Sequence, residues 1–393
     1  MGTVPMHQRL ESHPHGRGAH ATHMRESPTQ FRRVVDADAT AEYAPPADLG
    51  EATMVISDAQ SDQPPMRPDY AALIERARKD VPDRIGDYRI VRLLGRGGMG
   101  LVYEAVQDTY ISRHVALKVV RADGASDPAR MLQRFKLEAA LLARLNHPNV
   151  VTLYDTGVTE SGEPFFVMER VTGSPLRRYC ERHRLTIQQR LNLFAELCDV
   201  VHYVNGRGIV HRNINPHNAM VATIGVKKGI KLIDFGIAKP LFDDDLLDPP
   251  PEEMGQVIGS LAYMSPEQAR GELSVDARTD IYALGVVLYE MLTGSRPIEL
   301  DVGRGKLSTL VERITSQRPP LASMLYRKSS ENSRAKADER RSTPRKLHRM
   351  LRGELDEIAF KCLRKNLDHR FATAGEIAER IRAWTPPRRW WQW

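Results

Sequence analysis

The stretch from Asp280 to Thr293 carries apolar side chains on nearly every side of the helix that its sequence predicts. Such a helix is stable in water only when other elements enclose it, so the chain must build a large helical unit around it. Gly294 follows as a helix stop signal. Helical periodicity begins near Leu176, and Ile187 to Val204 is a long amphipathic segment within it.

Strand patterns precede this helical part. Strands are predicted at residues 88–94, 101–106, 114–120, 150–154 and 165–169. Asp127-Pro128 signals a helix start between the third and fourth of them. Apolar positions at helical spacing follow, with Glu138 among them. The sequence therefore predicts an α+β protein in which a small, mainly β unit precedes a larger, mainly helical one.

The first 86 residues differ from the rest of the chain. They are rich in Pro, His, Asp, Ala and Arg and show no sustained period, which predicts a disordered N-terminal arm at 1–86. An apolar fraction of 41% for the whole chain, under the usual value of about 45–50%, agrees with one polar stretch. The histidines near the start fit either a metal-binding tract or a solvated tail, and the lack of nearby cysteine favours the tail.

The basic excess of the chain is local. Of 57 basic and 50 acidic residues, 10 basic and 3 acidic ones lie in Arg327 to Arg352, and the remainder balances. We therefore expect no nucleic-acid binding. The stretch fits a surface helix or loop, with an acidic partner as the alternative to a solvated face.

Several protein classes are not expected. Cys180, Cys198 and Cys362 lack paired spacing, which argues against a disulfide framework or a zinc ribbon. No apolar run approaches the roughly 18 residues of a membrane span. The first residues lack the apolar core of a secretory signal and the pattern of an acylated start. A cytoplasmic protein without a transmembrane segment is the expectation.

The first chemical signal is a glycine-rich turn, Gly95-x-Gly97-x-x-Gly100-x-Val102, between two predicted strands. Glycines let the backbone approach a phosphate closely and present amide donors to it. A dinucleotide-binding loop would be followed by a helix, whereas a strand follows here. A plain hairpin without a ligand remains the alternative on this motif alone.

Two charges fall in apolar surroundings. Lys118 lies at the centre of an apolar strand, and Glu138 lies in the apolar stripe of the next helix. Buried charges are costly unless they are paired, so an ion pair between them is predicted. A solvated Lys and a rim Glu are the alternative.

Three further signals follow along the chain. They are the run from His211 to Asn218, Asp234-Phe235-Gly236 after an apolar strand, and Ser265-Pro266-Glu267. Asn218 and Asp234 carry oxygen ligands of the kind that Mg²⁺ takes beside nucleotide phosphates. Each triplet alone is weak, but all these signals in this order are specific.

Taken together, these motifs resemble those of the bacterial eukaryotic-like (Hanks-type) Ser/Thr protein kinases. The resemblance covers residues 87–383 and includes VALK, RFKLEAALLARLNHPNVV, FFVMERV, HRNINPHN, DFG, GSLAYMSPEQ, DARTDIYALGVVLYEMLTG and KCLRKNLDHRFATAGEIA. It implies a two-lobed protein-kinase fold, with a β-rich N-lobe at 87–170 and a helical C-lobe at 171–383. The residues that follow form a Trp/Arg-rich tail at 384–393.

The resemblance also implies ATP and Mg²⁺ as ligands and assigns roles to matching positions. Lys118 would hold the α/β-phosphates and pair with Glu138, and Asn218 and Asp234 would hold Mg²⁺. Glu267 would pair with Arg370, and Asp280 would brace the catalytic loop. The nucleotide-binding positions would be Gly95, Arg96, Gly97, Gly98, Gly100, Val102, Ala116, Lys118, Met168, Glu169 and Val171.

The catalytic loop departs from the family pattern His-Arg-Asp-x-Lys-Pro-x-x-Asn. Asn213 stands at the Asp position and Asn215 at the Lys position. In the segment before Pro266-Glu267, Ser260 stands where the family usually has Thr. A neutral amide cannot take the proton of the acceptor hydroxyl at pH 7. Residual transfer is possible because positioning and metal charge supply most of the catalysis. We therefore predict a Ser/Thr kinase domain that binds ATP–Mg²⁺ with weak or absent turnover, acting on a protein substrate. The alternative is a non-catalytic scaffold or regulatory pseudokinase that binds a partner kinase.

Two surface segments carry further hypotheses. Residues 237–258 contain no Ser, Thr or Tyr but contain six carboxylates, so Arg212 would pair with one of them or the loop would be solvated. Trp384 fits the inner face of a terminal helix. The last three tryptophans, Trp390, Trp391 and Trp393, would contact a partner or membrane surface, or fold back on their own lobe.

Overall fold

The computed structural model describes residues 81–97, 100–108, 112–120, 128–235, 261–272, 275–299 and 307–386. All of them belong to one compact unit, Arg67–Trp393. Residues 1–80 of the predicted N-terminal arm, the acidic segment at 237–258 and the last three tryptophans lie outside the described residues, whereas Arg84–Ile85 at the end of the predicted arm form a strand.

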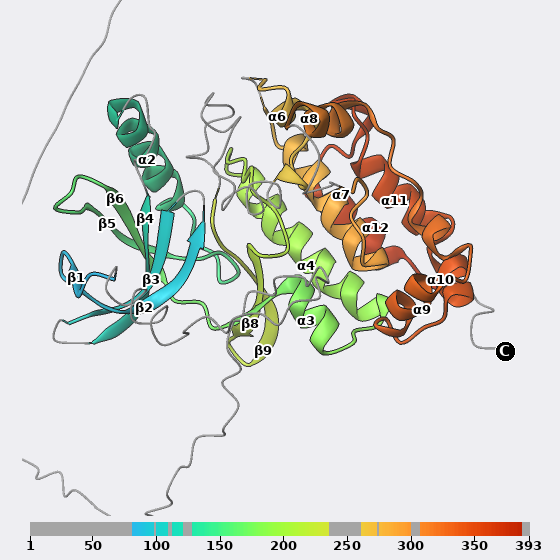
Figure 1. Cartoon of the computed structure of the whole chain (residues 1–393), viewed down its shortest axis with the longest axis horizontal. Helices are drawn as coiled ribbons and strands as arrows, with labels where there is room; N and C mark the ends of the chain where they lie inside the picture. The colour runs from blue at the N-terminus through green and yellow to red at the C-terminus, as the bar shows by residue number, and fades with distance from the viewer. Residues whose placement is uncertain are drawn as a thin grey trace, which may run out of the picture. The chain divides into compact units, whose positions relative to one another are not determined.

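Six antiparallel strands form the sheet of the N-terminal part, in the order β1-β2-β3-β4-β6-β5. Helix α2, Pro128–Leu142, is the helix labelled beside this sheet in Figure 1. The strands are β1 (Arg84–Ile85), β2 (Tyr88–Gly97), β3 (Gly100–Gln107), β4 (Arg113–Val120), β5 (Leu153–Val158) and β6 (Pro164–Glu169).

Alternation along β4 gives the sheet two different faces. Val115, Leu117 and Val119 are buried in a core of their own with Tyr88, Ala105 and other apolar residues of the sheet. The residues between them face the other way. This arrangement confirms the alternation that the sequence predicts for residues 114–120.

The strand predicted to begin at Val150 begins instead at Leu153. Val150 forms an isolated parallel bridge with Leu232, and Val151 donates its amide to the Leu232 carbonyl at 2.9 Å. These two apolar residues belong to the second part of the molecule, because their backbone pairs there rather than in the large sheet.

A second sheet, of which the sequence predicted only the apolar strand before Asp234, lies among the helices. Its order is β7-β8-β9, with β7 at Gly173–Pro175, β8 at Ala219–Ile224 and β9 at Lys227–Leu232. The strands are short, and a helical periodicity on both sides masked their alternation. This hairpin places the residues that precede β8 and follow β9 next to one another.

Helices make up the rest of the C-terminal part (Figure 1). The basic stretch predicted as a surface helix or loop forms helices α9 and α10. The described helices are α3 (Leu176–Arg182), α4 (Ile187–Asn205), α6 (Pro266–Ala269), α7 (Arg278–Thr293), α8 (Leu307–Ser316), α9 (Glu331–Asp338), α10 (Pro344–Leu351), α11 (Glu354–Cys362) and α12 (Ala374–Ala383), with 3₁₀ turns at Ala322–Tyr326 and Leu367–His369.

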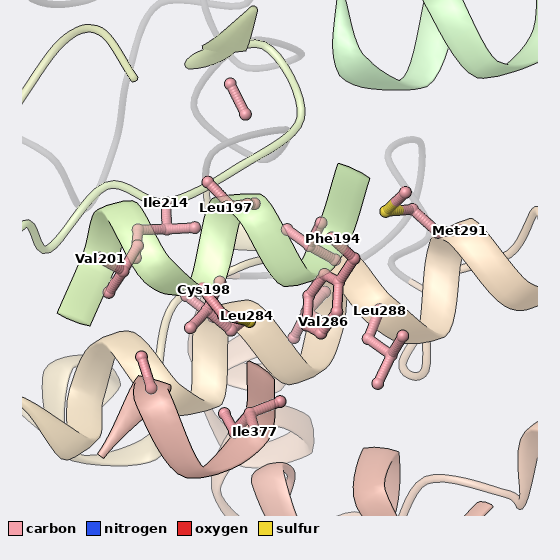
Figure 2. Packing of buried hydrophobic residues seen from close by; sticks show 14 of the residues in the cluster. Phe194, Leu197, Cys198, Val201, Ile214, Leu284, Val286, Leu288, Met291 and Ile377 are labelled. Atoms are coloured by element: carbon pink, nitrogen blue, oxygen red, sulfur yellow. The ribbon is translucent and has the colours of Figure 1, made fainter. Parts of the chain in front are cut away.

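Helix α7 lies at the centre of this part, as its apolar sequence predicts. Every residue from Thr279 to Thr293 is buried, and Gly294 ends the helix with φ 73° in the left-handed region. Figure 2 shows side chains of α4, including Phe194 and Cys198, packed against Leu284 and neighbouring residues of α7. The interior therefore holds α7 in one position, which matters because Asp280 in its first turn supports the site described next.

Candidate nucleotide site

Several predicted site residues lie together on the face of the large sheet opposite its apolar core, which we call the open face. Val102 pairs with Lys118 across β3 and β4, and Ala116 pairs with Met168 across β4 and β6. Residues paired across antiparallel strands point to the same face. Lys118 on this face reaches Asp234, just after β9, so the face is turned toward that segment.

The glycine-rich hairpin joins β2 to β3 at the edge of this face. Gly100 has φ 135°, and a Cβ there would lie 1.8 Å from the Val119 carbonyl oxygen, so the hairpin itself requires glycine. A Cβ on Gly95 would meet no heavy atom within 4 Å. That open space leaves room for a ligand to approach the backbone. Arg96 between them is exposed, and Gly98 lies outside the described residues.

Lys118 is held as a cation. Its side chain is 13% exposed and forms an ion pair with Asp234. Burial alone would lower the pKa of Lys118, but attraction to Asp234, and to a smaller extent to Glu138, raises it above the usual range. Glu138, the partner predicted from the sequence, thus contributes attraction to Lys118 beside that of Asp234. A buried ammonium with this support is suited to holding phosphate oxygens.

Asp280 fixes the backbone of the catalytic loop. Its Oδ2 accepts hydrogen bonds from the His211 amide at 2.8 Å and from the Asn205 side chain at 2.9 Å, and its Oδ1 accepts one from the Arg212 amide at 2.9 Å. Burial raises the pKa of Asp280 to about 6, and these three donors oppose the rise. The bracing role predicted for Asp280 is confirmed.

Two non-glycine residues of the site have left-handed backbones. They are Arg212, with φ 63°, and Asp234, with φ 55°. Such conformations persist only where neighbours hold them, and they are frequent at functional sites. Here Gln268 donates to the Arg212 carbonyl at 3.2 Å, and the rings of His211 and Phe235 stack with centroids 4.3 Å apart.

Three asparagines form a hydrogen-bonded cluster beside Asp234. Asn213 Nδ2 lies 3.3 Å from Asp234 Oδ2, and Asn215 Nδ2 lies 3.3 Å from Asn213 Oδ1 and 3.1 Å from the Asn213 carbonyl. Asn218 Nδ2 donates to the Asn213 carbonyl at 2.9 Å. The nitrogen of Asn218 is thereby engaged, and its side-chain oxygen is the atom left to offer a cation.

The oxygen atoms of this cluster fit a magnesium ion that is also coordinated by phosphate oxygens. Asn218 and Asp234 supply oxygen, the ligand type that Mg²⁺ prefers. Among the described residues, no group of three or more His, Cys, Asp or Glu could hold a metal ion.

The segment that contains Met168, Glu169 and Val171, which are predicted to bind the nucleotide, connects the two parts of the molecule. Met168 packs partly buried against the larger core. The Glu169 carboxylate pairs with Lys231 of β9 at 2.7 Å and accepts from the Thr152 amide at 3.3 Å, so its side chain is engaged away from Met168. Val171 is half-buried. The backbone amide of Glu169 also donates to the Thr152 carbonyl, at 2.9 Å.

Sequence analysis missed a charge cluster on the open face of the sheet. Glu104, whose side chain is 6% exposed, accepts from Arg92 at 2.9 Å and contacts His114 and Arg170 at 3.0 Å each. It lies opposite Ala116 in the sheet register. An acidic residue on the same face as Lys118 was the signal available in the sequence.

A buried ion pair joins Glu267 and Arg370 in the helical part of the molecule. Arg370 Nη1 and Nη2 bind the two carboxylate oxygens of Glu267 at 2.7 and 2.8 Å, and both side chains are 0% exposed. Although burial would raise it, the pKa of Glu267 is lowered because Arg370 and Thr279 donate to the carboxylate. The predicted Glu267–Arg370 pair is confirmed.

The chain matches the protein kinase domain model over residues 88–380. The chain belongs to the protein kinase domain family. It is 35% identical over 314 residues to the serine/threonine-protein kinase PknB of Mycobacterium leprae, covering 78% of this chain and 45% of that protein. It is 36% identical over 301 residues to PknB of Mycobacterium tuberculosis, covering 75% and 42%. The chain thus spans less than half the length of these relatives.

Solved structures agree on the fold. The PknI kinase domain of Mycobacterium tuberculosis superposes with a TM-score of 0.51 at 24% identity, covering 76% of this chain and 97% of that domain. Its C20A_R136A double mutant gives 0.53 at 23% identity, covering 76% and 96%. The predicted fold class, a β-rich N-lobe followed by a helical C-lobe, is confirmed. No helix in the described part of this kinase domain is both long and apolar enough to cross a membrane.

Proposed function

We propose that this Ser/Thr protein kinase domain binds ATP at the open face of the sheet and transfers its γ-phosphate slowly or not at all. The observation that carries the proposal is the contact between Asn213 and Asp234. A kinase of this family has an aspartate at the position of Asn213, and this aspartate takes the proton of the hydroxyl group that receives the phosphate. Here an amide nitrogen stands 3.3 Å from the metal-binding carboxylate instead.

Support for nucleotide binding comes from residues that keep their family identities. Lys118 is a buried cation, Gly95 leaves open space for phosphate, and Val102 and Ala116 offer an apolar face to a base. A magnesium ion brought by the nucleotide would be held by Asn218 and Asp234 and would supply positive charge against the phosphates. The chain itself binds and orients the triphosphate.

Support for weak transfer comes from the acceptor side. Asn213 is 8% exposed, and its Oδ1 accepts a hydrogen bond from Asn215 Nδ2 at 3.3 Å. Proton acceptance by a positioned base is typically worth about 10²–10⁴-fold in rate. The loss of a cation at Asn215 removes electrostatic support for the transferred group as well. A partner-binding scaffold that does not bind nucleotide is the alternative function.

A thermal-shift titration separates these two functions. We expect ATP to raise the melting temperature of the full chain in a saturable manner. In Lys118→Met, the apparent affinity for ATP taken from this titration should fall at least about tenfold, because the phosphate-binding cation is lost. Lys227→Met, in an exposed part of β9, is the matched control and should behave as the wild type. Equal, unsaturable curves for all three chains would favour the scaffold.

A further inference from the structure

The two asparagines that replace catalytic residues form a directed chain of hydrogen bonds. Asn215 Oδ1 accepts from the backbone amides of His217 at 2.9 Å and Asn218 at 3.2 Å, so its other atom must be the donor. That donor, Nδ2, lies 3.3 Å from Asn213 Oδ1. The orientation of Asn215 is thus fixed by the backbone, and it in turn orients Asn213.

Asn213 passes this orientation to Asp234. Because a carboxylate accepts but does not donate, the Asn213 atom that faces Asp234 Oδ2 at 3.3 Å is its amide nitrogen. Lys118 occupies Asp234 Oδ1 from the other side. Both oxygens of the metal-binding carboxylate therefore have donors from the protein itself.

An aspartate at position 213 would change this balance. Two carboxylates would then face each other across about the distance that now separates Asn213 Nδ2 from Asp234 Oδ2, 3.3 Å. Like charges at such a separation repel unless a cation lies between them. An aspartate therefore creates a requirement for a cation that the asparagine removes.

We propose that Asn213, oriented by Asn215, takes the place of a divalent cation in holding Asp234, so that the domain binds a nucleoside triphosphate without magnesium. This inference rests on the proposed nucleotide binding and adds the form in which the nucleotide binds. In this arrangement Lys118 supplies the positive charge that faces the triphosphate. Asn213 and Asn215 are positioning residues here, since they act through Asp234.

The test measures the affinity of a fluorescent ATP analogue for the full chain in excess EDTA and in excess Mg²⁺. For the wild type we expect the two dissociation constants to agree within about 3-fold. Asn213→Asp should bind at least about tenfold more tightly with Mg²⁺ than in EDTA, because its extra carboxylate needs the cation. Asn215→Asp keeps the acceptor for the backbone amides but removes the donor to Asn213, and should move in the same direction.

Asn192→Asp is the matched control. It makes the same chemical change on the exposed face of α4, where its oxygen accepts from Gln188, and its ratio should equal that of the wild type. Melting temperatures measured in EDTA without nucleotide check that each variant is folded. If Asn213→Asp does not fold, the wild-type ratio and Asn215→Asp still decide the matter.

The possible outcomes separate the two levels of the proposal. Wild-type binding that needs Mg²⁺ would overturn this inference while leaving nucleotide binding intact. No binding in either buffer would overturn both. A ratio in Asn213→Asp equal to that of the wild type would also contradict the role given to the Asn213 amide, because folding alone does not set the dependence on the cation.

Discussion

At the scale of single residues, the site depends on carboxylates whose oxygens are fully engaged. Asp280 is the clearest case, because one buried side chain holds the amides of His211 and Arg212 as well as Asn205. Its family role could be predicted from the motif around it. The three donors that it satisfies could not be predicted, because they depend on the folded path of the loop.

Asp280→Asn should lower the free energy of unfolding by about 2–4 kcal/mol. The amide places an NH₂ group against donors that now face carboxylate oxygens, and each stranded buried group costs about 1–3 kcal/mol. Urea denaturation at pH 7 measures the loss. Gln188→Ala, on the exposed face of α4, should change stability by less than about 0.5 kcal/mol.

The same residue should give stability a dependence on pH. The pKa of Asp280 in the folded protein is raised to about 6, above the value of about 4 for a free Asp. The folded state therefore binds the proton more tightly. The stabilisation from this group is complete below pH of about 4 and is lost as pH rises through 6. The stability difference between wild type and Asp280→Asn should grow when pH falls from 7 to 5, and a constant difference would contradict the assigned pKa.

At the scale of elements, close packing around α7 limits what its positions accept. A Cβ on Gly285 would lie 2.5 Å from the Cβ of Cys362 on α11. Both atoms belong to rigid parts of buried helices, so one helix must shift. We expect Gly285→Ala to lower the free energy of unfolding by about 1–3 kcal/mol, against the roughly 1 kcal/mol gain that Ala would bring to an unconstrained helix. Thermal denaturation with calorimetry measures the change, and a gain in stability would refute the packing argument.

Elements with a strong period were predictable from sequence, and those set by long-range pairing were not. Helix α7 was expected from apolar residues on all sides, and α4 from its amphipathic pattern. The strand expected to begin at Val150 begins at Leu153, because Val150 pairs with Leu232, far along the chain. Of the β8–β9 hairpin only the apolar strand before Asp234 was predicted, since the short strands of this hairpin pair within a helical region.

At the scale of the whole molecule, contacts between the sheet and the helical part decide how the site is assembled. Lys231 of β9 pairs with Glu169 of β6 at 2.7 Å and donates to the Pro148 carbonyl at 2.7 Å. No local pattern marks Lys231, because its partners lie far away in the sequence. This is the part of the site that sequence reasoning could not supply.

Lys231→Met should weaken ATP binding about 3- to 10-fold and reduce the melting temperature. It leaves Glu169 without its cation and the two parts of the domain less firmly joined at the segment that would face the base. Isothermal titration measures the affinity. Lys228, on the same strand, donates to Thr223 at the surface, so Lys228→Met should leave the affinity for ATP unchanged. Equal affinity in the two variants would contradict a role for Lys231.

The most direct test of the central claim is single-turnover transfer of labelled γ-phosphate by the full chain, with Mg²⁺, to itself or to a general protein acceptor. The wild type should transfer at a rate at least about 10²-fold below that of the double variant Asn213→Asp, Asn215→Lys, which restores the base and the cation. Lys118→Met added to the double variant should abolish the gain. Rapid transfer by the wild type that is lost in Lys118→Met would contradict the claim that Asn213 has removed the base while the nucleotide site remains.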